Sequence, residues 1–464
     1  MAGPVKVDKR KVMPVGLFTA EVIAAAGKET GVGLVVPRTR RGISKREGGK
    51  VVANTEDYRQ EVIDPGDRAS AAAKEVCFQS HGNCPALAVV PHVPGNFRGP
   101  VGWAWKPHIL AEMAKTQFGA GGQVEFWEML EEVENDGAGG KPQFFTLVGT
   151  PEVMRGLGWE IIAMTADDFA RSGRFPAIMV NDLNVKRVTK ANFPLVQAMF
   201  EGYGEALAQS GMVNVTGEIA IMKHSITAFC DDGSDEQLVL TWGGACVGLS
   251  SRRLLIDGSA IKPGMFIVGL KERGYRCNGG TWFTKLLLAK FGPEIAKIRA
   301  NSEAMELARK LVVPSISYAK TLTRVAGWNP DGSVSEPLVN MAGIAHITGG
   351  GVWGKFGEIL PEGVGAKLDN MPEPPEVLLQ AQKLSQGTPH ELPDLNAYGT
   401  LHGGCGMLVV CKTEADARKL VAEAAADWIG ASIVGMTTES ADGEVRIESR
   451  FRENRWLSSK ELEE

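Results

Sequence analysis

Apolar and polar positions alternate along most of the chain in a way that predicts short helices and strands. Helical spacing of apolar residues predicts helices at 193–209 and 414–425, and an Ala-rich stretch after a capping Asp67 predicts one at 64–74. Apolar runs between turn residues predict strands at 161–164, 212–215, 238–249, 265–270, 366–369, 407–411 and 445–448. Short strands interleaved with helices indicate α+β or α/β layers and argue against an all-helical bundle.

A turn containing glycine and proline at 257–263 separates two strand-like runs and is the best internal boundary. We therefore expect one domain at 61–262 and a second at 263–450. Residues 1–60 are interpreted as an N-terminal extension, with a short helix at 17–26 and a basic stretch at 37–42 that fits a solvated arm. Residues 451–464 are expected to form a frayed polar tail.

Composition narrows the functional class. The 464 residues are 44% hydrophobic and carry a formal charge of -5, which suits a globular chain and argues against sequence-independent nucleic-acid binding. No apolar run reaches the ~18 residues of a membrane span, and the first residues lack a secretory apolar core. Seven cysteines, spread from Cys77 to Cys411, do not form a small disulfide framework. A reducing, cytoplasmic setting fits these features best, and the mild acidic balance says nothing about small anionic ligands.

Glycine is the unusual residue, at 56 of 464 against a typical ~7%. The loop Asn135-Asp-Gly-Ala-Gly-Gly-Lys141 has bare backbone N–H groups and a lysine, which suit phosphate, although an ordinary flexible turn is the better interpretation of this loop alone. His346-Ile-Thr-Gly-Gly-Gly351 follows a predicted strand and precedes a predicted helix at 352–359, an arrangement typical of anion binding. Gly274-Tyr-Arg-Cys-Asn-Gly279 also joins a strand to a helix. There Arg276 suits phosphate contact and Asn278 suits an amide contact.

Carboxylates follow two of the apolar runs. Asp167 and Asp168 come after the predicted strand at 161–164, and Glu218 comes after the one at 212–215. Carboxylates at strand ends beside small residues suit Mg²⁺ that also contacts nucleotide phosphates, although each pair alone is more often a cap or a solvated turn. His402 is interpreted as local structure.

Taken together and in order, these motifs resemble the aminoimidazole ribonucleotide synthetase (phosphoribosylformylglycinamidine cyclo-ligase) family. The main match is His346-Ile-Thr-Gly-Gly-Gly351 followed by Ile359-Leu-Pro-Glu-Gly-Val-Gly-Ala366. Tyr398–Met407, Asp136-Gly-Ala-Gly-Gly-Lys141, Ala163-Met-Thr-Ala-Asp-Asp168, Gly217-Glu218 and Ile256-Asp-Gly258 are similar to further family segments. The resemblance covers roughly residues 61–450.

The resemblance implies a two-domain α+β fold, a homodimer built on the N-terminal sheets, and an ATP- and Mg²⁺-dependent ring closure in purine biosynthesis. It leaves the need for a monovalent cation open. Asp136, Asp168 and Glu218 would hold Mg²⁺, Lys141 would neutralise phosphate charge, and backbone N–H groups of the triple glycine would bind phosphate. The candidate catalytic residues are Lys141, Asp168, Arg276 and Asn278. The candidate nucleotide-binding residues are Asp136, Gly137, Gly139, Lys141, Gly217, His346, Thr348, Gly349, Gly350 and Gly351.

Several positions depart from the family pattern. Thr216 replaces a glycine, Arg276 and Cys277 replace a His-Ser pair, and His402 replaces an asparagine. Gly95-Asn-Phe-Arg-Gly99 is the candidate for the substrate-binding glycine loop. Two alternatives therefore remain. One is another ATP-using member of the superfamily, similar to formylglycinamidine ribonucleotide synthetase, selenophosphate synthetase or thiamine-phosphate kinase. The other is a catalytically degenerate homologue that acts as a binding or structural protein.

Overall fold

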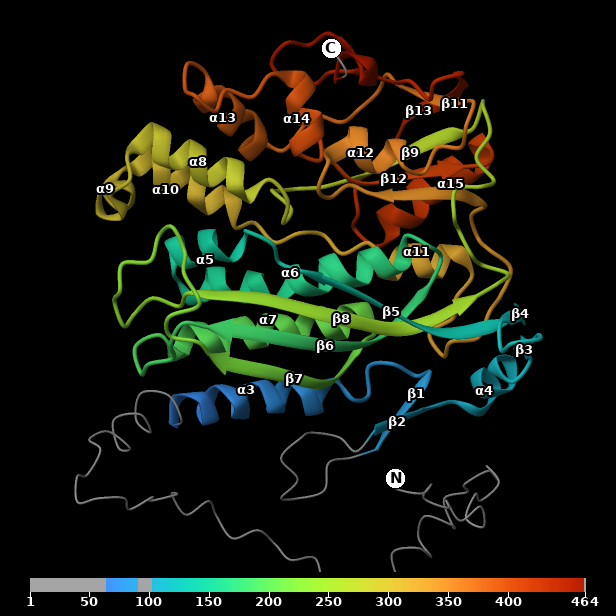
Figure 1. Ribbon diagram of the computed structural model, residues 1–464, viewed down its shortest axis with the longest axis horizontal. Coiled ribbons are helices and arrows are strands. Elements are labelled where there is room, and N and C mark those ends of the chain that lie inside the picture. The colour runs from blue at the N-terminus through green and yellow to red at the C-terminus, as the bar shows by residue number, and fades with distance from the viewer. Residues whose placement is uncertain (1–63, 91–101, 463–464) are drawn as a thin grey trace, which may run out of the picture. The chain divides into compact units, whose positions relative to one another are not determined.

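The computed structural model describes residues 64–90 and 102–462, all within one compact unit. The helix expected at 17–26, the basic stretch at 37–42 and the candidate loop Gly95–Gly99 lie outside the described residues. The two long sheets come from separate parts of the sequence (Figure 1).

The smaller of these sheets has four strands in the order β5-β8-β6-β7. Its strands are β5 (Met129–Gly137), β6 (Phe175–Val185), β7 (Val213–Ile221) and β8 (Leu240–Ser251). β8 runs antiparallel to both β5 and β6, and β6 runs parallel to β7. The side chain of Asn181 on β6 contacts Tyr203 of α7, so the face of the sheet that carries Asn181 is the face covered by helices.

The larger sheet has seven strands in the order β10-β12-β9-β13-β11-β14-β15. Its strands are β9 (Phe266–Lys271), β10 (Met341–His346), β11 (Val364–Leu368), β12 (Cys405–Cys411), β13 (Ala431–Glu439), β14 (Val445–Glu448) and β15 (Trp456–Ser458). All neighbours are antiparallel except β11 and β14. Two short antiparallel pairs complete the described strands: β1 (Leu87–Val90) with β2 (Gly102–Trp105), and β3 (Gln117–Phe118) with β4 (Val124–Phe126).

Helices cover these sheets and connect their strands. They are α3 (Asp64–Ser80), α4 (Pro107–Met113), α5 (Pro142–Val148), α6 (Pro151–Ala170), α7 (Phe193–Ser210), α8 (Gly280–Phe291), α9 (Ile295–Ala300), α10 (Ser302–Leu311), α11 (Ala319–Ala326), α12 (Gly351–Gly357), α13 (Glu376–Ser385), α14 (Asp394–Thr400), α15 (Glu414–Ala426) and a 3₁₀ turn at Ser459–Leu462. Their ends follow ordinary capping rules. Proline in the first turn and left-handed glycine at the C-cap bound both α5 and α7. The fold is α+β.

The strand predicted at 161–164 is wrong, because these residues lie in the middle of α6. α6 is 20 residues long and is buried on nearly all sides. A helix that is buried on all sides has a continuous run of apolar residues, and so does a buried strand. The run alone therefore cannot distinguish a helix from a strand. Asp167 and Asp168 therefore lie in the last turn of a helix and not at a strand end.

Three smaller expectations also need correction. α3 begins at Asp64, one turn before the expected cap at Asp67. Glu218 lies within β7, which continues to Ile221, and does not follow the strand. The tail after Arg450 is not frayed throughout, since β15 pairs with β14. The helices predicted at 193–209 and 414–425 and the strands predicted at 238–249, 265–270, 407–411 and 445–448 are confirmed to within two residues at each end.

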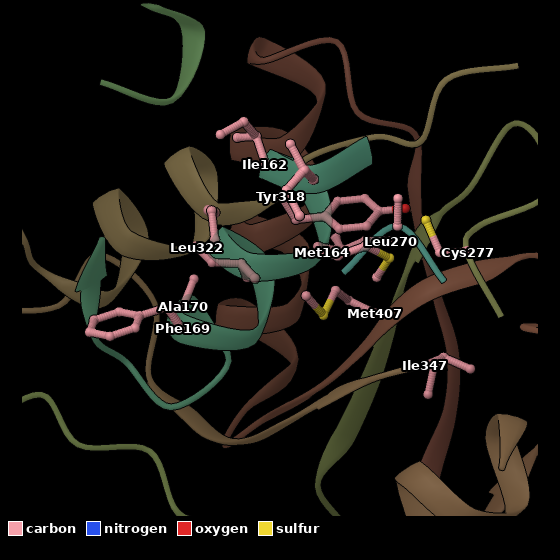
Figure 2. Close-up of a cluster of buried hydrophobic side chains, with 14 of the residues drawn as sticks. Ile162, Met164, Phe169, Ala170, Leu270, Cys277, Tyr318, Leu322, Ile347 and Met407 are labelled. Atoms are coloured by element: carbon pink, nitrogen blue, oxygen red, sulfur yellow. The ribbon is translucent and has the colours of Figure 1, made fainter. Parts of the chain in front are cut away.

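One continuous core joins α6 to the seven-stranded sheet. Figure 2 shows Met164 of α6 together with Leu270 of β9, Met407 of β12 and Tyr318 just before α11. Each of these four side chains is fully buried. The C-terminal turn of α6 is tied to the end of β10 by the bond between Asp168 and His346, and this contact brings the candidate site together.

Candidate functional site

Two of the predicted glycine motifs lie directly against each other. Gly139 has a φ of +54°, and a Cβ there would stand only 2.7 Å from the carbonyl oxygen of Cys277. Gly140 and Gly280 also approach so closely that a Cβ on either would stand 3.1–3.4 Å from the other's Cα. The loop that ends at Lys141 is therefore packed on the turn that carries Arg276 and Asn278.

The Lys141 side chain is fully buried, which does not match the expected role of neutralising phosphate charge. Its ammonium group lies 2.7 Å from Glu160 Oε1, and Glu160 is also fully buried. The ammonium also donates to the carbonyl oxygens of Tyr275 and Val313, the latter at 2.8 Å. Lys141 thus ties α6 and the 275–280 turn to the segment after α10, and its charge is compensated within the protein.

Arg276 is buried as well, with 1% of its side chain exposed. One guanidinium nitrogen donates to Glu272 at 2.8 Å, and the other donates to Asp167 at 3.0 Å. The second nitrogen also lies 2.8 Å from Nε2 of His346. With two buried carboxylates and an imidazole around it, Arg276 is not placed to contact a substrate phosphate.

His346 links Arg276 to Asp168. Its Nδ1 lies 2.8 Å from Asp168 Oδ1, and its side chain is 1% exposed. Burial lowers the pKa of His346 to about 4, and the nearby Arg276 charge acts in the same direction. The pKa of Asp168 is also lowered, since the hydrogen bond and charge interaction with His346 and the charges of Arg171 and Arg276 together outweigh the opposing effect of burial. Near neutral pH the site therefore has a neutral imidazole beside an ionised carboxylate.

Asp136 is the second carboxylate of this site. Burial raises its pKa, a bond from the Gly137 amide opposes that effect, and the charge of Asp168 raises the pKa further. Within residues 64–90 and 102–462, no ion pair to Asp136 is found. A half-buried carboxylate without a cation, beside a second carboxylate, is an environment that a divalent cation would relieve.

Glu218 does not join these two carboxylates. Gly137, Gly243, Asp182 and Glu218 are cross-strand neighbours, so Glu218 is three strands, or roughly 14 Å, from the end of β5. It also lies on the sheet face opposite Asn181, away from α6. Among the described residues, no group of three His, Cys, Asp or Glu side chains is arranged to hold a metal ion. The expected three-carboxylate set is therefore not assembled, whereas Asp136 and Asp168 suit a Mg²⁺ that takes its remaining ligands from phosphate and water.

The triple glycine follows closely after His346, the residue bonded to Asp168. Gly349 and Gly350 are exposed, and a Cβ on Gly349 would stand 3.6 Å from Asn278 Oδ1. Gly351 is buried, with its amide donating to the carbonyl of Thr348. A small polar cavity of about 80 Å³ opens here, lined by Asp168, Arg171, Ala345, His346, Thr348, Lys355, Glu358 and Ile359. Gly217, like Glu218, lies on β7 and apart from this group.

Three buried carboxylates organise the site: Glu160, Asp167 and Glu272. Sequence reasoning missed Glu160 and Glu272, and it named Asp167 only as part of a carboxylate pair suited to Mg²⁺ and not as the partner of Arg276. A helical interpretation of 151–170 would have found two of them, because Glu160 and Asp167 are seven residues apart and share a helix face. His402 is a local structural residue, as expected. It bonds to the Gly274 carbonyl and the Gly404 amide, and burial lowers its pKa to about 4.

Other features bear on the predicted class of protein. All seven cysteines are free and buried. Among the described helices, none has both the length and the apolar character that crossing a bilayer requires. A larger groove of about 590 Å³ between α3, α6 and α7 contains none of the predicted site residues.

Two family models match the chain. One is described as the N-terminal domain of AIR synthase related protein and matches residues 132–249. The other is described as the C-terminal domain of AIR synthase related protein and matches residues 334–448. Together they match half of the chain.

The chain is also similar to individual proteins. A phosphoribosylformylglycinamidine cyclo-ligase from Magnetococcus marinus is 28% identical over 314 residues, which are 67% of this chain and 79% of the relative. Among solved structures, Escherichia coli HypE is 13% identical with a TM-score of 0.47, covering 84% of this chain and 95% of HypE. A thiamine-monophosphate kinase from Stenotrophomonas maltophilia is 14% identical with a TM-score of 0.44, covering 74% of this chain and 96% of the kinase.

Proposed function

The chain belongs to the AIR synthase-related family, and from this premise we propose that it is an ATP-dependent cyclo-ligase of purine biosynthesis. It would convert formylglycinamidine ribonucleotide to aminoimidazole ribonucleotide. The observation that carries the proposal is Asp168, which His346 anchors at one oxygen and which lines a polar cavity together with Thr348, the residue before the triple glycine. The relative that bears the cyclo-ligase name supports this choice over other members of the superfamily.

The reaction requires a poor leaving group to be converted into a good one. The formamide oxygen attacks the γ-phosphorus of ATP, and the bond from that phosphorus to ADP breaks. The amidine nitrogen then attacks the activated carbon, the carbon–oxygen bond breaks to release phosphate, and a proton is lost as the ring closes. The first step depends on positioning and charge neutralisation rather than on a protein nucleophile.

The residues of the site suit this work in separate ways. Asp136 and Asp168 would hold Mg²⁺, which when bound neutralises phosphate charge. The exposed amides of Gly349 and Gly350 would bind phosphate oxygens, and Asn278 would orient an amide of the substrate. Lys141 and Arg276 would act indirectly, by fixing the loops that carry these groups.

The volume of the cavity limits how much of the nucleotide it can enclose. At about 80 Å³ it has room for a phosphate-sized group and not for a whole nucleotide, whose sites usually occupy ~300–1,000 Å³. The rest of ATP would therefore lie along the surface next to Asn278 and Gly349.

A homodimer is part of the proposal. Asn135, Ala245, Val180 and Thr216 form one row across all four strands, on the face opposite Asn181. On the same face of β5, Val133 is 65% exposed. Pairing of this face with its copy would cover Val133, and light scattering of the purified protein measures the mass directly.

A substrate panel tests the activity. The protein is incubated with Mg·ATP and, in separate reactions, formylglycinamidine ribonucleotide, formylglycinamide ribonucleotide with glutamine, selenide, or thiamine monophosphate. We expect ADP and aminoimidazole ribonucleotide in the first reaction only. Turnover in another reaction would replace the proposed substrate, and a protein that neither binds nucleotide nor turns over any substrate would be a degenerate homologue.

A variant tests the site. Asp168→Asn should lower turnover by at least about 100-fold and keep the fold, since an amide cannot supply the negative charge that Mg²⁺ requires. Asp427→Asn is the matched control, because Asp427 is also a partly exposed carboxylate paired with an arginine, Arg324. Equal activity in the two variants would remove Asp168 from the mechanism.

A further inference from the structure

Arg276 stands where the family that this chain resembles has a histidine, and its contacts give it a different task. We propose that Arg276 is a positioning residue that acts through His346 to fix the carboxylate of Asp168. The inference rests on the proposed function for the identity of the ligand, Mg²⁺ with a nucleotide, and on the observed contacts for everything else.

The first step is the state of His346. A guanidinium only donates hydrogen bonds, so Nε2 of His346, at 2.8 Å from Arg276, must accept. In a neutral imidazole the proton is then on Nδ1, where it points to Asp168 Oδ1 at 2.8 Å. Arg276 as donor at Nε2 and Asp168 as acceptor at Nδ1 thus favour the same tautomer, and losing Arg276 weakens that preference.

The second step is the rigidity of Arg276 itself. Glu272 and Asp167 hold its two terminal nitrogens, and the carbonyl oxygen of Ile316 accepts from the nitrogen that bonds Glu272. Asp167 is in turn fixed by the amides of Tyr318 and Ala319, at 2.7 and 2.8 Å. A guanidinium with partners on both nitrogens has little freedom to turn, so His346 meets a fixed donor.

The third step is the carboxylate oxygen of Asp168 that stays available for a ligand. Nδ1 of His346 and Nε of Arg171, at 3.1 Å, both lie at Oδ1. Across the part of the chain that the structure describes, Oδ2 of Asp168 has no hydrogen-bond donor. Asp168 lines the polar cavity and is 18% exposed, so one oxygen is anchored and the other is left for a ligand. Groups that orient a metal ligand in this way typically change metal affinity or activity by ~10–100-fold when removed.

The experiment measures the His346 tautomer and the Mg²⁺ dependence of ADP binding separately. With ¹⁵N-histidine labelling, long-range ¹H–¹⁵N spectra assign the His346 tautomer, with a His346→Gln sample identifying its signals among the seven histidines. Arg276→Lys keeps a positive charge but offers a single nitrogen, which cannot serve Glu272, Asp167 and His346 together. We expect mixed tautomers in this variant and a 10–100-fold rise in the Mg²⁺ concentration that half-saturates ADP binding. Arg324→Lys, in an ion-pair cluster with Glu423 and Asp427, is the control and should change neither quantity.

A second pair of variants keeps the test decisive if Arg276→Lys folds poorly. An asparagine amide at 346 can take the place of Nδ1 and donate to Asp168, whereas a glutamine amide extends toward the place of Nε2. His346→Asn should therefore retain the Mg²⁺ dependence better than His346→Gln. An unchanged tautomer in Arg276→Lys, an unchanged Mg²⁺ dependence, or the reverse order of the two His346 variants would overturn the positioning role. If the unmodified protein binds no ADP, the proposed function fails instead, and the tautomer in Arg276→Lys alone decides whether Arg276 fixes His346.

Discussion

Replacing Lys141 separates the buried role found in the structure from the phosphate-binding role expected from sequence. Lys141→Met keeps most of the side-chain volume and removes the charge. Lys141 and Glu160 are both fully buried and 2.7 Å apart, so the variant leaves the Glu160 carboxylate without its counter-charge in the interior. Breaking such a pair on one side costs about 3–5 kcal/mol, a large part of the typical ~5–15 kcal/mol stability of a protein.

Thermal unfolding and a double-mutant cycle measure this cost. For a chain of 464 residues, a loss of that size lowers the melting temperature by roughly 3–6 °C. Glu160→Gln should lower the stability by a comparable amount, because it leaves the buried Lys141 ammonium without its counter-charge. The double variant Lys141→Met/Glu160→Gln should recover part of the loss, since no full charge then remains buried. Nucleotide affinity, measured at a temperature where each variant is folded, should fall far less than the roughly 100-fold or more expected if Lys141 contacted phosphate directly.

The opposite pattern would refute this reasoning. If Lys141→Met melted at the wild-type temperature while nucleotide affinity fell by 100-fold or more, the lysine would bind phosphate and the buried pair would not represent the working protein. A double variant as destabilised as the sum of the two single variants would show that Lys141 and Glu160 are not coupled.

Two further predictions concern pH and backbone conformation. Burial lowers the pKa of both His346 and His402 to about 4, so the unfolded chain binds their protons first as pH falls from about 6.5. Each histidine should therefore lower the free energy of unfolding by about 3 kcal/mol as pH falls from 6.5 toward 4. Asp167 acts in the opposite direction over this range, because burial raises its pKa to about 7. In urea unfolding, His402→Gln should make the protein lose less stability than the wild type between pH 6.5 and pH 4. Gly351→Ala should lower the free energy of unfolding by about 2 kcal/mol or more, because φ is +60° and the new Cβ would stand 2.1 Å from the Tyr398 carbonyl oxygen. Gly354→Ala is the control: it has open space around it and should be neutral or stabilising in the same urea unfolding experiment.

The sequence was most informative where elements are amphipathic or bounded by turn residues. The helices at 193–209 and 414–425 have one polar face each, and the strands of the C-terminal sheet are short apolar runs between turns. The prediction of a strand at 161–164 was wrong for a physical reason: α6 is buried nearly all round, so it has no polar face that would reveal its helical period. That single error moved Asp167 and Asp168 from a helix end to a strand end, and it hid the shared face of Glu160 and Asp167.

The site was predictable as a set of motifs but not as a set of roles. Motif order placed Asp136, Asp168, Asn278 and the triple glycine in one site. The structure puts Gly349 next to Asn278 and bonds His346 to Asp168. Whether a charged side chain faces a ligand or the interior depends on partners far away in sequence. Lys141 meets Val313, and Arg276 meets Asp167, over separations of more than 100 residues. No local pattern states such pairings, so the sequence could not show that both cations are internal.

The glycine surplus can be reconsidered in the same terms. Glycine clusters were expected to let backbone approach a phosphate, yet most of the predicted ones let backbone approach backbone. Gly139 lies against the Cys277 carbonyl, Gly279 against that of Thr400, and Gly351 against that of Tyr398. These contacts stack the segments that carry Asp136, Asn278 and His346 on one another, and only Gly349 and Gly350 of the triple glycine remain exposed. Under the proposed function, the glycines would contribute to phosphate binding mainly by fixing the positions of the carboxylates. A side chain at Gly139 should then weaken the proposed Mg²⁺ binding without contacting the ligand.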